Sequence, residues 1–96
     1  MNRDDVLAVL SEFKRDSGDK YGILELGVFG SVARGVAGEA SDVDVCIKTR
    51  TPDPYVLVHI KEDLEQRVRR HVDIVRVRDR MNPSLRERIE REGIYV

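Results

Sequence analysis

The chain has 96 residues, a net charge of −1 and 41% hydrophobic, 36% charged and 5% aromatic residues, which predicts one small globular domain over residues 1–96. The balanced charge and the few aromatic side chains predict no direct binding of nucleic acid, and no apolar run approaches the about 20 residues of a membrane span. Cys46 is the only cysteine, so no internal disulfide can form, and we expect a cytoplasmic protein.

The first half of the chain predicts a helix, a strand, a tight turn and a second strand. Residues 4–17 have the spacing of an amphipathic helix, with Gly18 following its end. Residues 23–29 read as a buried aliphatic strand, residues 31–35 as a single helical turn and residues 42–48 as an alternating strand. One face of that strand carries Val43, Val45 and Ile47, and the other carries Asp42, Asp44 and Cys46.

The second half predicts two more helices around a third strand. Asp53 and Pro54 form the cap and first residue of a helix whose apolar stripe runs to Val68. Its predicted i,i+4 ion pairs are Asp63/Arg67 and Glu65/Arg69. A strand at residues 71–77, a helix from Asn82-Pro83-Ser84 to Gly93 and a short edge strand at residues 94–96 follow. This order predicts an α/β fold, a small mixed sheet with helices mainly on one face.

Gly30 and Ser31 lie where a strand passes into a helical turn. The first amides of a helix lack partners within it and can bind an anion, and glycine lets a phosphate approach the backbone closely. The alternative is an ordinary strand-to-helix turn, because Gly-Ser is a common dipeptide. Alone, this turn is weak evidence for a phosphate site.

Three aspartates lie on two of the predicted strands. Asp42 and Asp44 share a face, where their mutual repulsion would be relieved by a divalent cation. Asp73 lies between two aliphatic residues, where a carboxylate is costly unless it is paired or binds metal. The alternatives are a solvent-facing strand for the pair and a salt bridge to an arginine for Asp73. Together, the three predict a two-metal site.

These motifs resemble the nucleotidyltransferase superfamily that includes DNA polymerase beta. The resemblance rests on Gly30-Ser31, Asp42-Val43-Asp44 and Asp73 in that order. The small size and the run Gly30-Ser31-Val32-Ala33-Arg34-Gly35 resemble the minimal nucleotidyltransferase family, whose members are often antitoxins of HEPN-type toxins. The resemblance implies a polymerase beta-like nucleotidyltransferase fold.

The same resemblance implies transfer of AMP from ATP to a hydroxyl, tyrosine being the expected acceptor, of a cognate HEPN-type toxin in a hetero-oligomer. Asp42 and Asp44 would hold two Mg²⁺ ions, and Asp73 would hold the catalytic ion and help to deprotonate the acceptor. Gly30 and Ser31 would hold phosphate. Arg34 would contact phosphate or pair with an acidic neighbour. The alternative function is an antitoxin that blocks its toxin by binding alone.

Other polar and aromatic residues are interpreted as structural. We expect Cys46 to be packed, His59 and His71 to be surface residues without metal-ligand partners, and the tyrosines to be half-buried. Six arginines against two aspartates in residues 67–80 predict a solvated rim or, alternatively, a patch for an acidic partner. The face with the three aspartates, in an open cleft, also carries Cys46, Val75 and Val77, which we expect a partner protein to cover.

Overall fold

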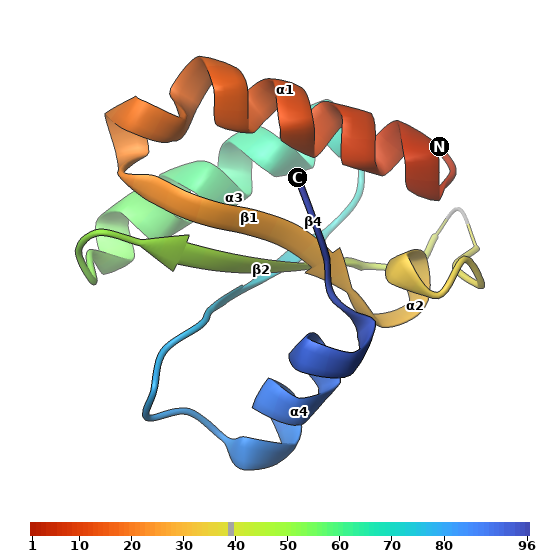
Figure 1. The fold of residues 1–96 in the computed structure, drawn as a ribbon. Coiled ribbons are helices and arrows are strands. Elements are labelled where there is room, and N and C mark those ends of the chain that lie inside the picture. The colour runs from red at the N-terminus through yellow and green to blue at the C-terminus, as the bar shows by residue number, and fades with distance from the viewer. Residues whose placement is uncertain (39) are drawn as a thin grey trace.

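The computed structural model describes residues 1–38 and 40–96. In this part of the chain, four strands form one sheet in the order β3-β2-β1-β4, and the helices lie on both of its faces (Figure 1). The elements are α1 (Arg3–Tyr21), β1 (Ile23–Phe29), α2 (Gly30–Ala33), β2 (Val43–Thr49), α3 (Pro54–Val68), β3 (Val72–Arg76), α4 (Pro83–Glu92) and β4 (Ile94–Tyr95).

The sheet is mixed, as predicted. Strand β2 runs antiparallel to β1 and parallel to β3, while the short β4 pairs antiparallel with β1. The registers place Phe29, Asp44 and Asp73 at one level of three neighbouring strands, because Asp44 is the Cα partner of both other residues. This level, where β1 ends and β2 and β3 begin, is where the site forms.

Helices α1 and α3 cover one face of the sheet (Figure 1). The predicted inward side of β2, formed by Val43, Val45 and Ile47, is fully buried against them. Burying such a side chain stabilises the fold by about 1.5–3 kcal/mol. The core residues that the two helices contribute are Val6, Leu10, Phe13, Ile60, Leu64 and Val68.

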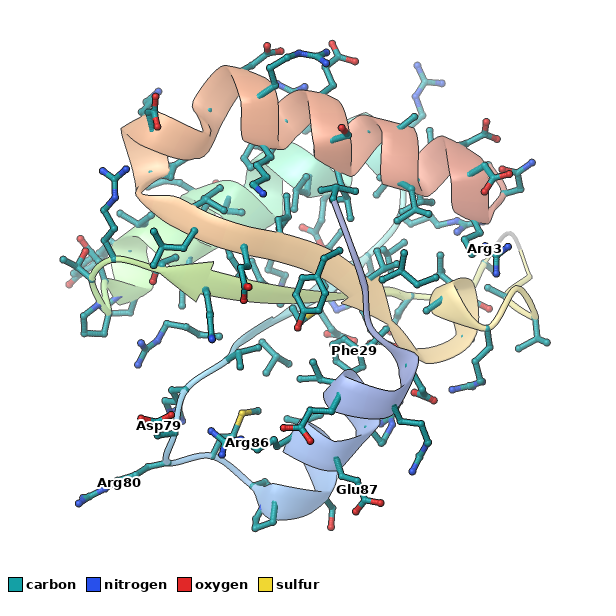
Figure 2. The ribbon with its side chains drawn as sticks, in the orientation of Figure 1. Arg3, Phe29, Asp79, Arg80, Arg86 and Glu87 are labelled. Atoms are coloured by element: carbon teal, nitrogen blue, oxygen red, sulfur yellow. The ribbon has the colours of Figure 1, made fainter. Side chains whose placement is uncertain are left out.

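Helix α4 covers the other face, which corrects the expectation that a partner must cover it. Phe29, Cys46 and Ile89 are buried together there, and Figure 2 shows Phe29 between β1 and α4. Val75 and Val77 pack partly buried against this cluster, together with Met81 and Leu85. The sequence predicts this helix, but sequence periodicity cannot say which face of a sheet a helix will cover.

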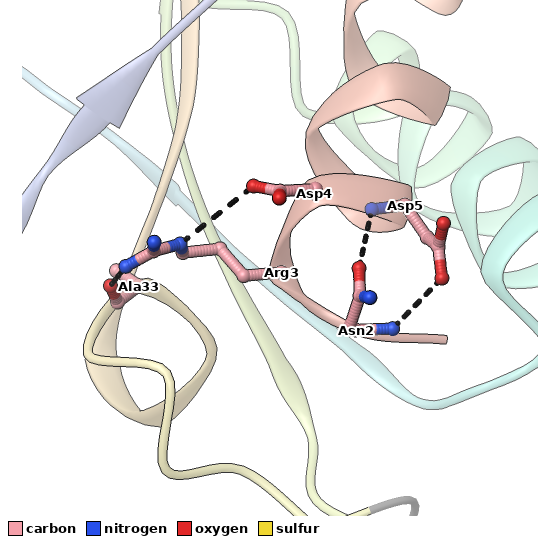
Figure 3. Close-up of polar contacts among 5 residues, drawn as sticks. All are labelled: Asn2, Arg3, Asp4, Asp5 and Ala33. Carbon is pink, nitrogen blue, oxygen red and sulfur yellow. Dashed lines mark hydrogen bonds and ion pairs between the residues drawn. The ribbon is translucent and has the colours of Figure 1, made fainter.

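Helix α1 extends beyond the predicted residues 4–17 at both ends. The Asn2 side chain accepts a hydrogen bond from the Asp5 amide at 2.9 Å, and the Asp5 carboxylate accepts one from the Asn2 amide at 3.0 Å (Figure 3). This capping box fixes the start of the helix. The left-handed residue that ends it is Gly22, with φ of 66°, so Gly18 lies inside the helix.

Replacing Gly18 by alanine is expected to raise the free energy of unfolding by about 0.5–1 kcal/mol, because glycine is entropically costly inside a helix. The nearest atom to an added Cβ is Lys14 Cγ at 3.6 Å, an ordinary contact. A thermal melt should show a rise in Tm of about 4 °C. A lower Tm would mean that the site does not accommodate the methyl group.

Helix α3 begins as predicted but ends at Val68, before Arg69 of the second predicted ion pair. Asp53 caps it by accepting from the amides of Tyr55 and Val56. The predicted pair of Asp63 with Arg67 forms, at 2.7 Å. The predicted pair of Glu65 with Arg69 is wrong: Arg69 is the left-handed cap of the helix, with φ of 55°, and Glu65 pairs with His71 instead. Tyr55 is 79% exposed rather than half-buried.

Candidate active site

Two of the three predicted carboxylates lie at one level of the sheet, and the third lies two residues before that level. Asp44 and Asp73 are Cα partners on β2 and β3, and Asp42 comes one residue before β2. Because side chains alternate along a strand, Asp44 shares the face of Cys46, which packs under α4. The carboxylates therefore line the part of this face beside α4.

Asp73 is half-exposed, with 51% of its side-chain surface accessible. Strand β3 is an edge of the sheet, so the carboxylate faces solvent although its neighbours are aliphatic. The sequence argument that burial makes Asp73 costly is therefore wrong. What distinguishes Asp73 is its position beside Asp44 and Asp42.

Gly30 is in direct contact with Asp44. Its φ is +73°, a region that L-residues rarely adopt, and a Cβ at this position would collide with Asp44 Oδ2. Glycine is thus needed here so that the turn can pass close to the carboxylate. Ser31 follows in the first turn of α2, which has no side-chain cap.

Burial and, after it, neighbouring like charges disfavour the ionised form of Asp44. Burial raises the pKa of its carboxyl above the ordinary value, and the neighbouring Asp73 and Asp42 raise this pKa further. Arg88 and Arg34 act in the opposite direction but do not cancel the effect. The ionised site therefore favours binding of a further cation.

His71 joins this site and was missed by the sequence interpretation, which gave it no metal-ligand partner. Its Nε2 lies 3.0 Å from Asp73 Oδ1, and its Nδ1 lies 3.0 Å from Glu65 Oε2. Glu65 also accepts a hydrogen bond from the Val72 amide. The signal in the sequence was the spacing of two residues that puts His71 and Asp73 on one face of a strand.

Arg34 forms the structural pair that was one of its two predicted roles. Its Nη1 lies 2.7 Å from Glu92 Oε2, and Arg88 Nε lies 3.5 Å from Glu92 Oε1. The hydrogen bond from Arg34 lowers the pKa of Glu92 most, and Arg88 and the Gly30 amide lower it further. Glu92 thereby connects α4 to the glycine turn, a contact between distant parts of the chain that the sequence pattern did not show.

The donor set fits a divalent cation. Asp42, His71 and Asp73 each offer a ligand atom, and these atoms lie within 4.8 Å of one another. Mg²⁺ prefers carboxylate oxygens, whereas imidazole suits transition metals. For Mg²⁺, the aspartates are therefore the suitable ligands, and His71 is better suited to orient Asp73.

Cys46 has no catalytic setting. It is fully buried, and this burial raises the pKa of its thiol. The interpretation of Cys46 as a packed residue is confirmed. Tyr95 hydrogen-bonds to it, and burial and this thiol together raise the pKa of Tyr95 to about 12.

The fold and this site define a nucleotide-transferring class of enzyme. Residues 9–96 match the model of the nucleotidyltransferase domain, and the chain belongs to this family. It is 30% identical over 94 residues to the protein adenylyltransferase MntA of Thermococcus cleftensis, covering 97% of this chain and 94% of that protein.

Solved structures show the same fold. A minimal nucleotidyltransferase structure superposes with a TM-score of 0.81 and 33% identity, covering 98% of this chain and 95% of that one. A toxin–antitoxin structure with AMP-PNP gives a TM-score of 0.75 at 20% identity, covering 99% and 72%. The complex of a tri-AMPylated Shewanella oneidensis HEPN toxin with its MNT antitoxin gives 0.71 at 17%, covering 97% and 70%.

Among the residues that the structure describes, no helix combines the length and apolar character needed to cross a membrane.

Proposed function

We propose that this nucleotidyltransferase transfers AMP from ATP to a hydroxyl group, a tyrosine being the expected acceptor, of a cognate HEPN-type toxin. The observation that carries the proposal is the meeting of Asp42, Asp44 and Asp73 beside the Gly30 turn. The adenylyltransferase name of the similar archaeal protein supports the reaction. The AMPylated HEPN toxin in a complex of the same fold supports the acceptor.

Each residue has a proposed role in this reaction. Asp42, Asp44 and Asp73 would hold two Mg²⁺ ions, and these ions would supply charge neutralisation for the triphosphate and activation of the attacking hydroxyl. Gly30 and Ser31 hold phosphate through the turn, and Arg34 contributes positive charge beside it while paired with Glu92.

The proton of the acceptor hydroxyl goes to Asp73. His71 Nε2 lies 3.0 Å from Oδ1 of this carboxylate and orients it, and the carboxylate takes up the proton as the hydroxyl attacks. The hydroxyl oxygen forms a bond to the α-phosphorus of ATP while the bond to pyrophosphate breaks. The toxin surface completes substrate recognition in a hetero-oligomer, and the free buried thiol of Cys46 fits a cytoplasmic setting.

Mass spectrometry of the genomic neighbour tests this proposal. The neighbour is incubated with the protein, ATP and Mg²⁺, and the expected result is a mass increase of one or more AMP groups on a tyrosine. Neutralisation of the neighbour should require ATP. Full neutralisation without ATP and without an adduct would instead support the antitoxin that acts by binding alone.

A further inference from the structure

Helix α4 brings a second arginine to the carboxylates. Arg88 and Glu92 lie one helical turn apart, so their side chains share one side of α4. Glu92 has only 10% of its side-chain surface exposed; its Oε2 accepts a hydrogen bond from Arg34 at 2.7 Å, and its Oε1, which has no hydrogen-bond partner, lies 3.5 Å from Arg88 Nε. One nearly buried carboxylate is thus hydrogen-bonded to Arg34 and ion-paired with Arg88, which come from different parts of the chain.

The flat face of Arg88 is also fixed. Its Cζ lies 5.5 Å from the centroid of the Phe29 ring, a cation–π geometry. Phe29 is the Cα partner of Asp44 on the neighbouring strand, so this contact places the guanidinium next to the carboxylates. The lowering effect of Arg88 on the pKa of Asp44 agrees with this proximity.

We propose that Arg88 binds the triphosphate of ATP beside the carboxylates. The contacts above use Nε and the face of the guanidinium, and the proposal assigns its terminal nitrogens to phosphate oxygens. Arginine suits this role because its planar donors match phosphate geometry and it keeps its charge at all working pH values. The inference rests on the proposed function, because it assigns a residue to the same nucleotide site.

A binding experiment tests Arg88 without any transfer step. Calorimetric titrations with ATP and with AMP, both with Mg²⁺, compare the wild type with Arg88→Gln, Arg88→Lys and the control Arg91→Gln. Arg91 lies on the same helix, is 62% exposed and pairs with Glu87 at 3.5 Å. Arg91→Gln therefore removes the same charge from α4 at a residue with a different ion-pair partner. A thermal melt of each variant checks that it is folded.

The expected result is a loss of ATP affinity of about tenfold or more in Arg88→Gln, with AMP affinity unchanged. Arg88→Lys should lose less, because it retains the charge and loses only the forked geometry, and Arg91→Gln should bind as the wild type does. Equal losses for ATP and AMP, or no loss for ATP, would overturn the inference. If the wild type binds ATP but Arg88→Gln binds it equally well, only the inference fails. If the wild type does not bind ATP, the proposed function fails with it.

Discussion

The Asp44→Asn variant is expected to lose AMP transfer by more than about a hundredfold. Asp44 is the central carboxylate, since it is the Cα partner of Asp73 and packs against Gly30. An amide keeps its shape but offers a cation no negative charge, and a bound metal contributes several kcal/mol to stabilising the transition state. The adduct assay under Proposed function measures the loss, with Asp16→Asn on α1 as a matched control.

The same variant is expected to have a higher Tm than the wild type in the absence of metal. The pKa of Asp44 is raised in the folded protein, so folding favours its protonated form and the ionised carboxylate opposes folding. The stabilisation by Asp44→Asn should thus be absent below the ordinary aspartate pKa and grow as pH rises through the raised pKa. Added Mg²⁺ should raise the Tm of the wild type more than that of the variant. A lower Tm for the variant at neutral pH would contradict this account.

Gly30→Ala is expected to lower the free energy of unfolding by about 2 kcal/mol and the Tm by about 10 °C. The new side chain must adopt φ of +73° and also displaces the Asp44 carboxylate. Transfer activity should fall in parallel, because either the turn or the carboxylate must move.

Gly35→Ala separates the two causes. Gly35 also has φ of +73°, but the atom nearest to an added Cβ is Arg3 Nη1 at 3.8 Å, an ordinary contact, so this variant experiences the backbone strain alone. Combining Gly30→Ala with Asp44→Ala should recover part of the lost stability, because the colliding carboxylate is gone. If both glycine variants lose the same stability, the contact between Gly30 and Asp44 does not matter.

Local patterns were enough to predict most of the sheet and the three aspartates that meet on it. Strand β1 has the predicted bounds because glycines flank its aliphatic residues. Helix α3 begins as predicted, with Asp53 as its N-cap and Pro54 as its first residue. The alternation along β2 placed Asp44 on the correct face. These features depend on residues close together in the chain.

The remaining features of the site depend on tertiary placement. Nothing in the sequence of α4 says that it covers Phe29 and Cys46, so the contact of Glu92 with Arg34 and that of Arg88 with Phe29 could not be foreseen. The exposure of Asp73 follows from the position of β3 at the sheet edge, which is a property of strand order. The spacing of His71 and Asp73 could have predicted that they share a face, but the contact of His71 with Glu65 of α3 could not be predicted from the sequence.

The buried thiol between the sheet and α4 gives this protein an internal reporter. Cys46 is the only cysteine in the sequence and has no exposed surface while Ile89 and Tyr95 lie against it. A thiol reagent reaches it when α4 or β4 separates from this face, and movement of α4 also carries Arg88 and Glu92 away from the carboxylates. The labelling rate therefore measures how often the molecule opens beside the proposed catalytic site.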